Sequence, residues 1–168
     1  MVYLIGAGPG DPKLITLRGV ECLRDADVIY YDYLANPQLL RHTRSDARHI
    51  CLGGHRDGRI WSQLEINEKL VHDAREGLTV ARLKGGDPSV FSRGTEEAEY
   101  LRDHQIEFEF VPGVTTALAA SAYTGIPITH RDLASSVAFV TGQQQQDSPS
   151  ALDYSKLAQF PGTLVFYM

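Results

Sequence analysis

Short apolar runs alternate with helix-like segments along most of the chain, and most of the runs end in a turn containing glycine, proline or aspartate. This alternation is typical of an α/β fold with a largely parallel sheet. The predicted strands cover residues 2–5, 28–31, 49–52, 78–83, 108–111, 136–141 and 163–168. We therefore expect several strand-to-helix turns to meet at one edge of a sheet.

Residues 62–76 form the most clearly marked helix. Ser62 and Glu65 have the spacing of a capping box, and Gly77 is a typical helix end. Further helices are predicted over residues 96–105 and 114–123. An additional helix should begin at Asp11-Pro12 and bury Leu14, Leu17 and Val20, which fall on one helical arc. Asn36-Pro37 is expected to open another.

Gly125-Ile126-Pro127 predicts a hinge between two α/β domains, residues 1–124 and 125–168. The second region contains strand, polar loop, short helix and strand, and the chain ends inside the apolar run. We expect the C-terminal α/β domain to be incomplete in this chain.

Composition restricts the possible classes of protein. No apolar stretch approaches the roughly 18 residues of a membrane span, and no signal-peptide pattern opens the chain, so a cytoplasmic protein is expected. The net charge of −5 argues against a broad nucleic-acid surface. Cys22 and Cys51 lack the spacing of a metal site, so no metal is predicted.

The first loop that could bind a ligand is Gly6-x-Gly8-x-Gly10, which lies between a strand and a helix. Glycines allow a close approach of backbone to ligand, although a glycine-rich turn without a ligand is the alternative. A dinucleotide fingerprint requires its third glycine at position 11, where Asp11 stands, and Pro9 removes a backbone donor. A dinucleotide is therefore disfavoured.

Two further loops follow predicted strands. Gly85-Gly86-Asp87 places a carboxylate at the ligand edge, where it suits the ammonium, sulfonium and ribose hydroxyls of S-adenosylmethionine better than a phosphate; a simple turn is the alternative. Thr115 and Thr116 follow Val111-Pro112-Gly113, and their hydroxyls either cap the next helix or face a cofactor.

Taken in order, the motifs of the chain resemble the uroporphyrinogen-III C-methyltransferases of the tetrapyrrole methylase family. The matching residues are 6–12, 31–32, 82–88, 90–91, 93–94, 96–97, 111–113, 125–131, 134–136, 141–142 and 163–168. The resemblance extends from Val2 to Met168 and favours this family over the later precorrin methyltransferases, diphthine synthase and ribosomal-RNA methyltransferases.

The resemblance implies a two-domain α/β homodimer that holds S-adenosylmethionine in the cleft between its domains and releases S-adenosylhomocysteine. The implied reaction methylates C2 and C7 of uroporphyrinogen III to give precorrin-2, on the route to sirohaem and cobalamin. The implied cofactor contacts are Pro9, Gly85, Gly86, Asp87, Val90, Thr115, Thr116 and Met168. Members of the family continue beyond the position that matches Met168.

Asp32 matches the family's proposed base, and its place after a buried strand should favour proton acceptance. A turn-capping acid is the alternative role. Family members usually carry a lysine where this chain has Gly54, so we expect His55 to act as proton donor instead. Arg56, Arg93, His130 and Arg131 are candidates to bind the carboxylates of the substrate, although each alone resembles an ordinary solvated side chain.

Other classes of function stay open at this point. Asp32 lies 24 residues after Gly8, about where a nicotinamide-dependent oxidoreductase has its ribose-binding acid. A non-catalytic tetrapyrrole-binding protein would fit the missing lysine. An RNA methyltransferase is disfavoured by the net charge.

Overall fold

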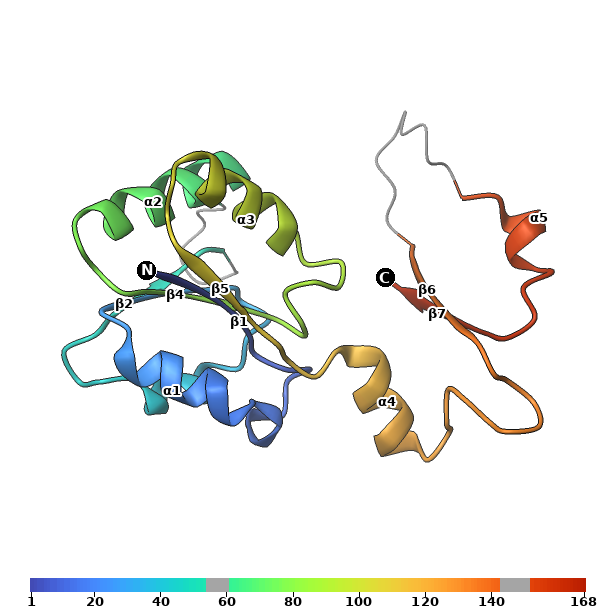
Figure 1. The fold of residues 1–168 in the computed structure, drawn as a ribbon. Coiled ribbons are helices and arrows are strands. Elements are labelled where there is room, and N and C mark those ends of the chain that lie inside the picture. The colour runs from blue at the N-terminus through green and yellow to red at the C-terminus, as the bar shows by residue number, and fades with distance from the viewer. Residues whose placement is uncertain (54–60, 143–151) are drawn as a thin grey trace. The chain divides into compact units, whose positions relative to one another are not determined.

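The computed structural model describes residues 1–53, 61–142 and 152–168. These residues form two compact units, Met1–Thr116 and Ala117–Met168, and each is described by itself (Figure 1). No helix in the described ranges is long and apolar enough to cross a membrane. The predicted domain boundary at residues 124–125 stays a prediction.

The first unit contains a five-stranded parallel sheet in the order β3-β2-β4-β1-β5. The strands are β1 (Val2–Gly6), β2 (Val28–Tyr31), β3 (Arg48–Cys51), β4 (Val80–Lys84) and β5 (Phe108–Val111). Strand β4 lies between β1 and β2, so that Val80 is opposite both Val2 and Val28. The predicted α/β class and parallel sheet are confirmed.

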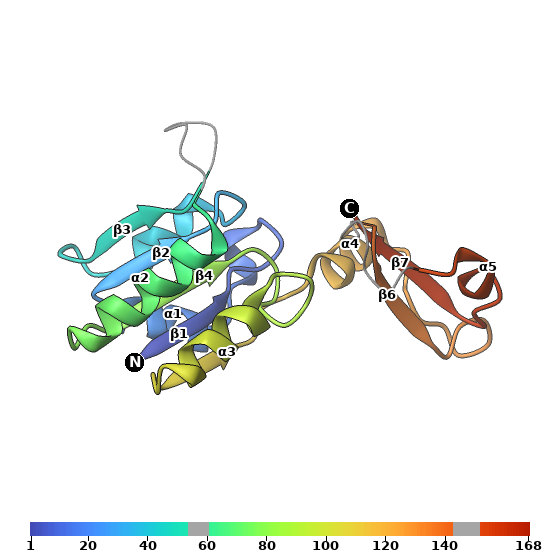
Figure 2. The same cartoon turned by 90° about the horizontal axis from the view of Figure 1, so that it is seen from above.

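Helices cover both faces of this sheet (Figures 1 and 2). Because crossovers between parallel strands are right-handed, the direction of travel across the sheet decides which face a connection covers. The chain moves outward from β1 through β2 to β3, and this path places α1 (Leu17–Asp25) and the 3-10 helix η2 (Pro37–His42) on one face. It returns through β4 to β5, which places α2 (Gln63–Arg75) and α3 (Gly94–Asp103) on the other face.

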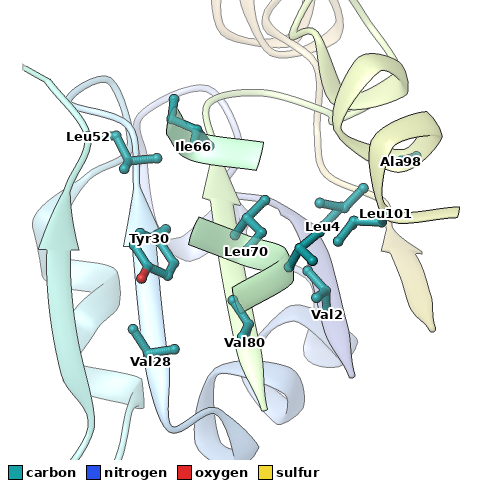
Figure 3. Packing of buried hydrophobic residues seen from close by; sticks show 11 residues of the cluster. Val2, Leu4, Val28, Tyr30, Leu52, Ile66, Leu70, Val80, Ala98 and Leu101 are labelled. Atoms are coloured by element: carbon teal, nitrogen blue, oxygen red, sulfur yellow. The ribbon is translucent and has the colours of Figure 1, made fainter. Parts of the chain in front are cut away.

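Both faces of the sheet are buried. On the side of α2 and α3, alternate strand residues meet apolar helix residues (Figure 3). The main members are Val2, Leu4, Val28, Tyr30, Val80, Ile66, Leu70 and Leu101. The intervening strand residues, among them Ile5, Ile29 and Leu83, pack against α1 and η2. Burial on both sides is why β1 and β2 are nearly continuous apolar runs in the sequence.

The start of α2 is confirmed in detail. The Ser62 N–H donates to Glu65 Oε2 (2.8 Å), and the Glu65 N–H donates to Ser62 Oγ (3.2 Å), so the capping box is complete. This arrangement satisfies amides that have no partner within the helix.

The predicted helix starting at Asp11 is wrong in its phase. Asp11 caps only a single 3-10 turn, η1 (Pro12–Leu14), and α1 starts afresh at Leu17, capped by Thr16. Because α1 begins at Leu17, a different set of its residues faces the core. Leu17 is 84% exposed, whereas Cys22 and Leu23 are fully buried.

The second unit contains nearly all of α4 (Thr116–Thr124), two parallel strands, β6 (Val137–Thr141) and β7 (Thr163–Tyr167), and the short helix α5 (Tyr154–Leu157). The Ala117 N–H donates to the Tyr167 hydroxyl (3.3 Å). The Gly142 N–H donates to the Tyr167 carbonyl (2.6 Å), so the carboxyl ends of the two strands lie side by side.

Candidate functional site

The loops after β1, β4 and β5 meet at three glycines, Gly6, Gly86 and Gly113, which we call the glycine junction. A methyl group added at Gly113 would lie 2.3 Å from the Gly86 carbonyl oxygen and 2.7 Å from the Gly6 Cα. These distances are shorter than any ordinary contact, and the atoms concerned are backbone. Only glycine therefore permits the three loops to approach one another so closely.

Backbone hydrogen bonds hold the first two loops together. The Gly8 N–H donates to the Gly86 carbonyl (3.1 Å), and the Gly86 N–H donates to the Gly8 carbonyl (2.8 Å). Both residues have a positive φ, +77° at Gly8 and +67° at Gly86, which glycine adopts without strain. Pro9 directly follows this pair, so the structure brings Pro9 close to Gly86 and Asp87.

Asp87 links the second loop to the third. Its Oδ2 accepts a hydrogen bond from the Gly113 N–H (2.9 Å), and its Oδ1 accepts from the Ser89 N–H (2.8 Å). The carboxylate thus fixes the glycine junction, a structural task that the sequence did not reveal. Each carboxylate oxygen can accept more than one hydrogen bond, so a cofactor contact by Asp87 stays a prediction.

The other predicted cofactor residues lie on the same loops, with one exception. A Cβ built at Gly85 would be 3.4 Å from Leu34 Cβ, so the loop after β2 adjoins the second loop. Val90 follows Asp87 by three residues, Thr115 is buried just after Gly113, and Thr116 begins α4. Met168 belongs to the second unit, where it lies beside Gly142.

Asp32 lies at the carboxyl end of β2. Its Oδ1 accepts a hydrogen bond from Arg82 Nη2 at 2.6 Å, and its side chain is 31% exposed. The expected desolvated carboxylate is therefore only partly buried, and it has a cationic partner that the sequence reading did not include. A partly exposed carboxylate that an ion pair holds in place can exchange protons with a bound molecule or with solvent.

Arg82 belongs to a buried cluster of charges that the sequence reading missed. Glu97 Oε1 accepts from Arg82 Nε (3.1 Å) and from Lys84 Nζ (2.9 Å), and all three side chains are at most 3% exposed. Burial, together with the nearby charge of Arg82, lowers the pKa of Lys84, although Glu97 opposes this effect. The sequence does contain a sign of this cluster, because two basic residues occupy alternate positions of a buried strand. Buried positive charges require an acidic partner.

The loop after Asp87 carries unusual backbone geometry. Phe91 and Arg93 have φ values of +49° and +60°, a region that residues other than glycine seldom occupy. Such conformations concentrate at ligand sites. Arg93 is exposed and forms a bidentate ion pair with Glu96, with N–O distances of 2.9 and 2.6 Å.

Two further candidate substrate residues, His130 and Arg131, belong to the second unit. In the second unit, His130 Nδ1 accepts from the Asp132 N–H (3.2 Å), and Arg131 is exposed. His55 and Arg56, like Gly54, lie outside the described residues, so their predicted roles stay predictions.

The helix starts near the first loop offer little to a pyrophosphate. Asp11 Oδ1 accepts from the Lys13 N–H (2.9 Å), and Thr16 Oγ1 accepts from the Gly19 N–H (3.1 Å). The chain's own side chains thereby occupy amides that bind phosphate in dinucleotide folds, and Asp11 adds a negative charge there. The geometry disfavours the oxidoreductase alternative.

Comparisons with known proteins identify the family of the chain. A family model described as Tetrapyrrole (Corrin/Porphyrin) Methylases matches residues 1–168. A protein of Bacillus subtilis (strain 168) named uroporphyrinogen-III C-methyltransferase is 51% identical, and the match covers 100% of this chain and 35% of that protein. One of the same name from Priestia megaterium is 50% identical, with 99% and 70% covered.

Among solved structures, uroporphyrin-III C-methyl transferase from Thermus thermophilus complexed with S-adenyl homocysteine is similar, with a TM-score of 0.81 and 41% identity over 99% of this chain and 69% of that chain. The chain therefore belongs to the tetrapyrrole (corrin/porphyrin) methylases. It spans only 30% to 35% of the length of four relatives, three of them named siroheme synthase.

Proposed function

We propose that the chain carries out S-adenosylmethionine-dependent C-methylation of uroporphyrinogen III, at C2 and C7, to give precorrin-2. The observation that carries the proposal is the glycine junction, which gathers three strand-end loops near Asp32 in a chain 51% identical to a uroporphyrinogen-III C-methyltransferase. The siroheme synthases among the relatives favour sirohaem as one destination of the product. Cobalamin is the second proposed destination.

The residues present fit a sulfonium cofactor. The loop segments 6–10, 85–90 and 112–116 contain no lysine or arginine, but they contain a carboxylate, hydroxyls and close-packed glycines. Such a lining suits a positively charged sulfur, an ammonium and ribose hydroxyls rather than a phosphate. We propose Pro9, Gly85, Gly86, Asp87, Val90, Thr115, Thr116 and Met168 as the contacts. When bound, S-adenosylmethionine supplies the activated methyl group.

The chain's own residues would do the remaining work. Asp32 would accept the proton that leaves the macrocycle after methylation, while Arg82 keeps its carboxylate in place. Arg56, Arg93, His130 and Arg131 would bind the acidic side chains of the tetrapyrrole. His55 would donate a proton in place of the lysine that the family usually carries at the position of Gly54.

We also propose the larger organisation that the resemblance implies. Residues 1–124 and 125–168 would belong to two α/β domains with the cofactor in the cleft between them, in a cytoplasmic homodimer. Sedimentation equilibrium tests the oligomeric state, and a mass corresponding to a monomer at micromolar concentration would contradict the dimer.

Anaerobic incubation with uroporphyrinogen III and methyl-labelled cofactor tests the function directly. We expect the macrocycle to gain two methyl groups. Asp32→Asn should lower turnover by about 100- to 10,000-fold, the usual contribution of a general base, and retain binding of S-adenosylhomocysteine in calorimetry. Porphyrinogen binding without label transfer would favour a non-catalytic binding protein, and binding of NAD instead of S-adenosylhomocysteine would favour the oxidoreductase.

A further inference from the structure

Glu97 is a fully buried carboxylate with an uneven set of partners. Its Oε1 accepts hydrogen bonds from Arg82 Nε, Lys84 Nζ (2.9 Å) and Gln63 Nε2 (3.2 Å). Its Oε2 is buried and has no hydrogen-bond partner among the described residues. A buried carboxylate oxygen without a partner is costly, so the placement of Glu97 depends on the bonds at Oε1.

Glu97 and Asp32 share one cationic partner, Arg82. Arg82 donates through Nε to Glu97 (3.1 Å) and through Nη2 to Asp32 (2.6 Å). A guanidinium is planar and rigid, so the bond at Nε fixes the direction in which Nη2 points. The positive charge of Arg82 is also divided between two carboxylates, one fully buried and one at the site.

We infer that Glu97 is a positioning residue that acts through Arg82 to keep Asp32 a competent proton acceptor. The inference rests on the proposed function, which assigns proton acceptance to Asp32. With Glu97 in place, the charge of Arg82 is shared and the negative charge of Glu97 lies nearby. Without that charge, Arg82 serves Asp32 alone, the ionised form of Asp32 is favoured, and its carboxylate accepts a proton less readily.

The titration of Asp32 tests this inference without any requirement for activity. Protein labelled with ¹³C at aspartate carboxyl carbons is titrated, and the Asp32 signal is assigned by its loss in Asp32→Asn. In Glu97→Gln, which keeps the size but removes the charge, we expect the midpoint of the Asp32 titration to fall below that of the parent. Glu97→Asp retains the charge and should stay closer to the parent.

An unchanged or raised midpoint in Glu97→Gln would overturn the inference, as would an equal fall in Glu97→Asp. If Glu97→Gln does not fold, the double variant Lys84→Met with Glu97→Gln removes the pair formed by Lys84 and Glu97 as a unit, a change that proteins often tolerate. Because the charge of Lys84 also acts on Asp32, this double variant is compared with Lys84→Met alone. The Asp32 midpoint should be lower in the double variant than in Lys84→Met, and equal midpoints would overturn the inference.

Asp73 provides the matched control. It is a second buried acid of the first unit, 3% exposed, and it accepts hydrogen bonds from Tyr30 (2.7 Å), Lys69 (3.0 Å) and His72 (3.0 Å) rather than from Arg82. Asp73→Asn should lower the melting temperature but leave the Asp32 titration unchanged. An equal shift in Asp73→Asn would show that general loosening is responsible and would overturn the inference.

Methyl transfer measured in the same samples separates the two proposals. If Glu97→Gln lowers the Asp32 midpoint but the parent protein transfers no methyl group, the proposed function alone is contradicted. An active parent whose Glu97→Gln variant shows the parental carboxyl titration contradicts the role of Glu97 alone. When both hold, the acidic limb of the pH–rate profile should move with the titration midpoint.

Discussion

Replacing Gly113 by alanine tests the glycine junction directly. The new methyl group would lie 2.3 Å from the Gly86 carbonyl oxygen and 2.7 and 2.9 Å from backbone carbons of Gly6. Each of these atoms belongs to a backbone that is tied by strand pairing or by the hydrogen bonds between Gly8 and Gly86. No side chain can rotate away, so relief of the clash requires one loop to move by about 1 Å.

The cost follows from this geometry. Overpacking that forces a backbone shift costs typically 1–3 kcal/mol, and because three loops are affected we expect about 3 kcal/mol. In a protein of this size each kcal/mol corresponds to about 2–4 °C in melting temperature, which gives a fall of about 6–12 °C. Binding of S-adenosylhomocysteine should weaken as well, because the same loops form the proposed cradle.

Differential scanning calorimetry measures the effect, with Gly53→Ala as the matched control. Among the described residues, a methyl group at Gly53 meets no atom within 4 Å, and Gly53 lacks a left-handed φ, so the change in stability should stay within about 0.5 kcal/mol. If Gly113→Ala melts within about 2 °C of the parent, the close approach of the three loops is refuted.

Three further predictions concern stability and reactivity. Burial alone would raise the pKa of the Asp73 carboxyl, but hydrogen bonds from Tyr30 and two basic neighbours hold it below its usual 3.8. Its stabilising contribution is therefore present well above pH 3.8 and is lost as the pH falls through the lowered value; Asp73→Asn should flatten this acid dependence in denaturant titrations. Ser62→Ala removes the α2 cap and should cost about 1 kcal/mol in urea unfolding; an unchanged midpoint would contradict the capping role. Burial raises the pKa of the Cys22 thiol to about 11, so mass spectrometry of a thiol-reagent reaction at pH 8 should show the half-buried Cys51 labelled first, and faster labelling of Cys22 would contradict its burial.

The inner part of the sheet was predictable because β1 and β2 are buried on both faces and are continuous apolar runs. Parallel topology predicted that the loops after the strands would meet at one edge. The charged residues of β4 were harder to interpret. Arg82 and Lys84 point toward a buried acid that comes more than ten positions later in the sequence, and only the packing of α3 on the sheet brings Glu97 to them.

The start of α1 was not predictable from local sequence, because Asp11 and Thr16 are both good capping residues. The chain uses both, one for η1 and one for α1, and the second start changes which residues are buried. The left-handed conformations of Phe91 and Arg93 were not predictable for a different reason. Glycine and asparagine are the residues that usually indicate this geometry, and neither residue type stands at these two positions.

The strand order has a consequence for folding during synthesis. Strands β1 and β2 are synthesised before β4 but are not neighbours in the sheet, and β4 is the strand that joins them. At a synthesis rate of about 5 to 20 residues per second, roughly 4 to 16 s separate residue 6 from residue 84. During this interval β1 and β2 are apolar segments that lack their shared partner strand, and the centre of the sheet forms only when Val80–Lys84 has been made.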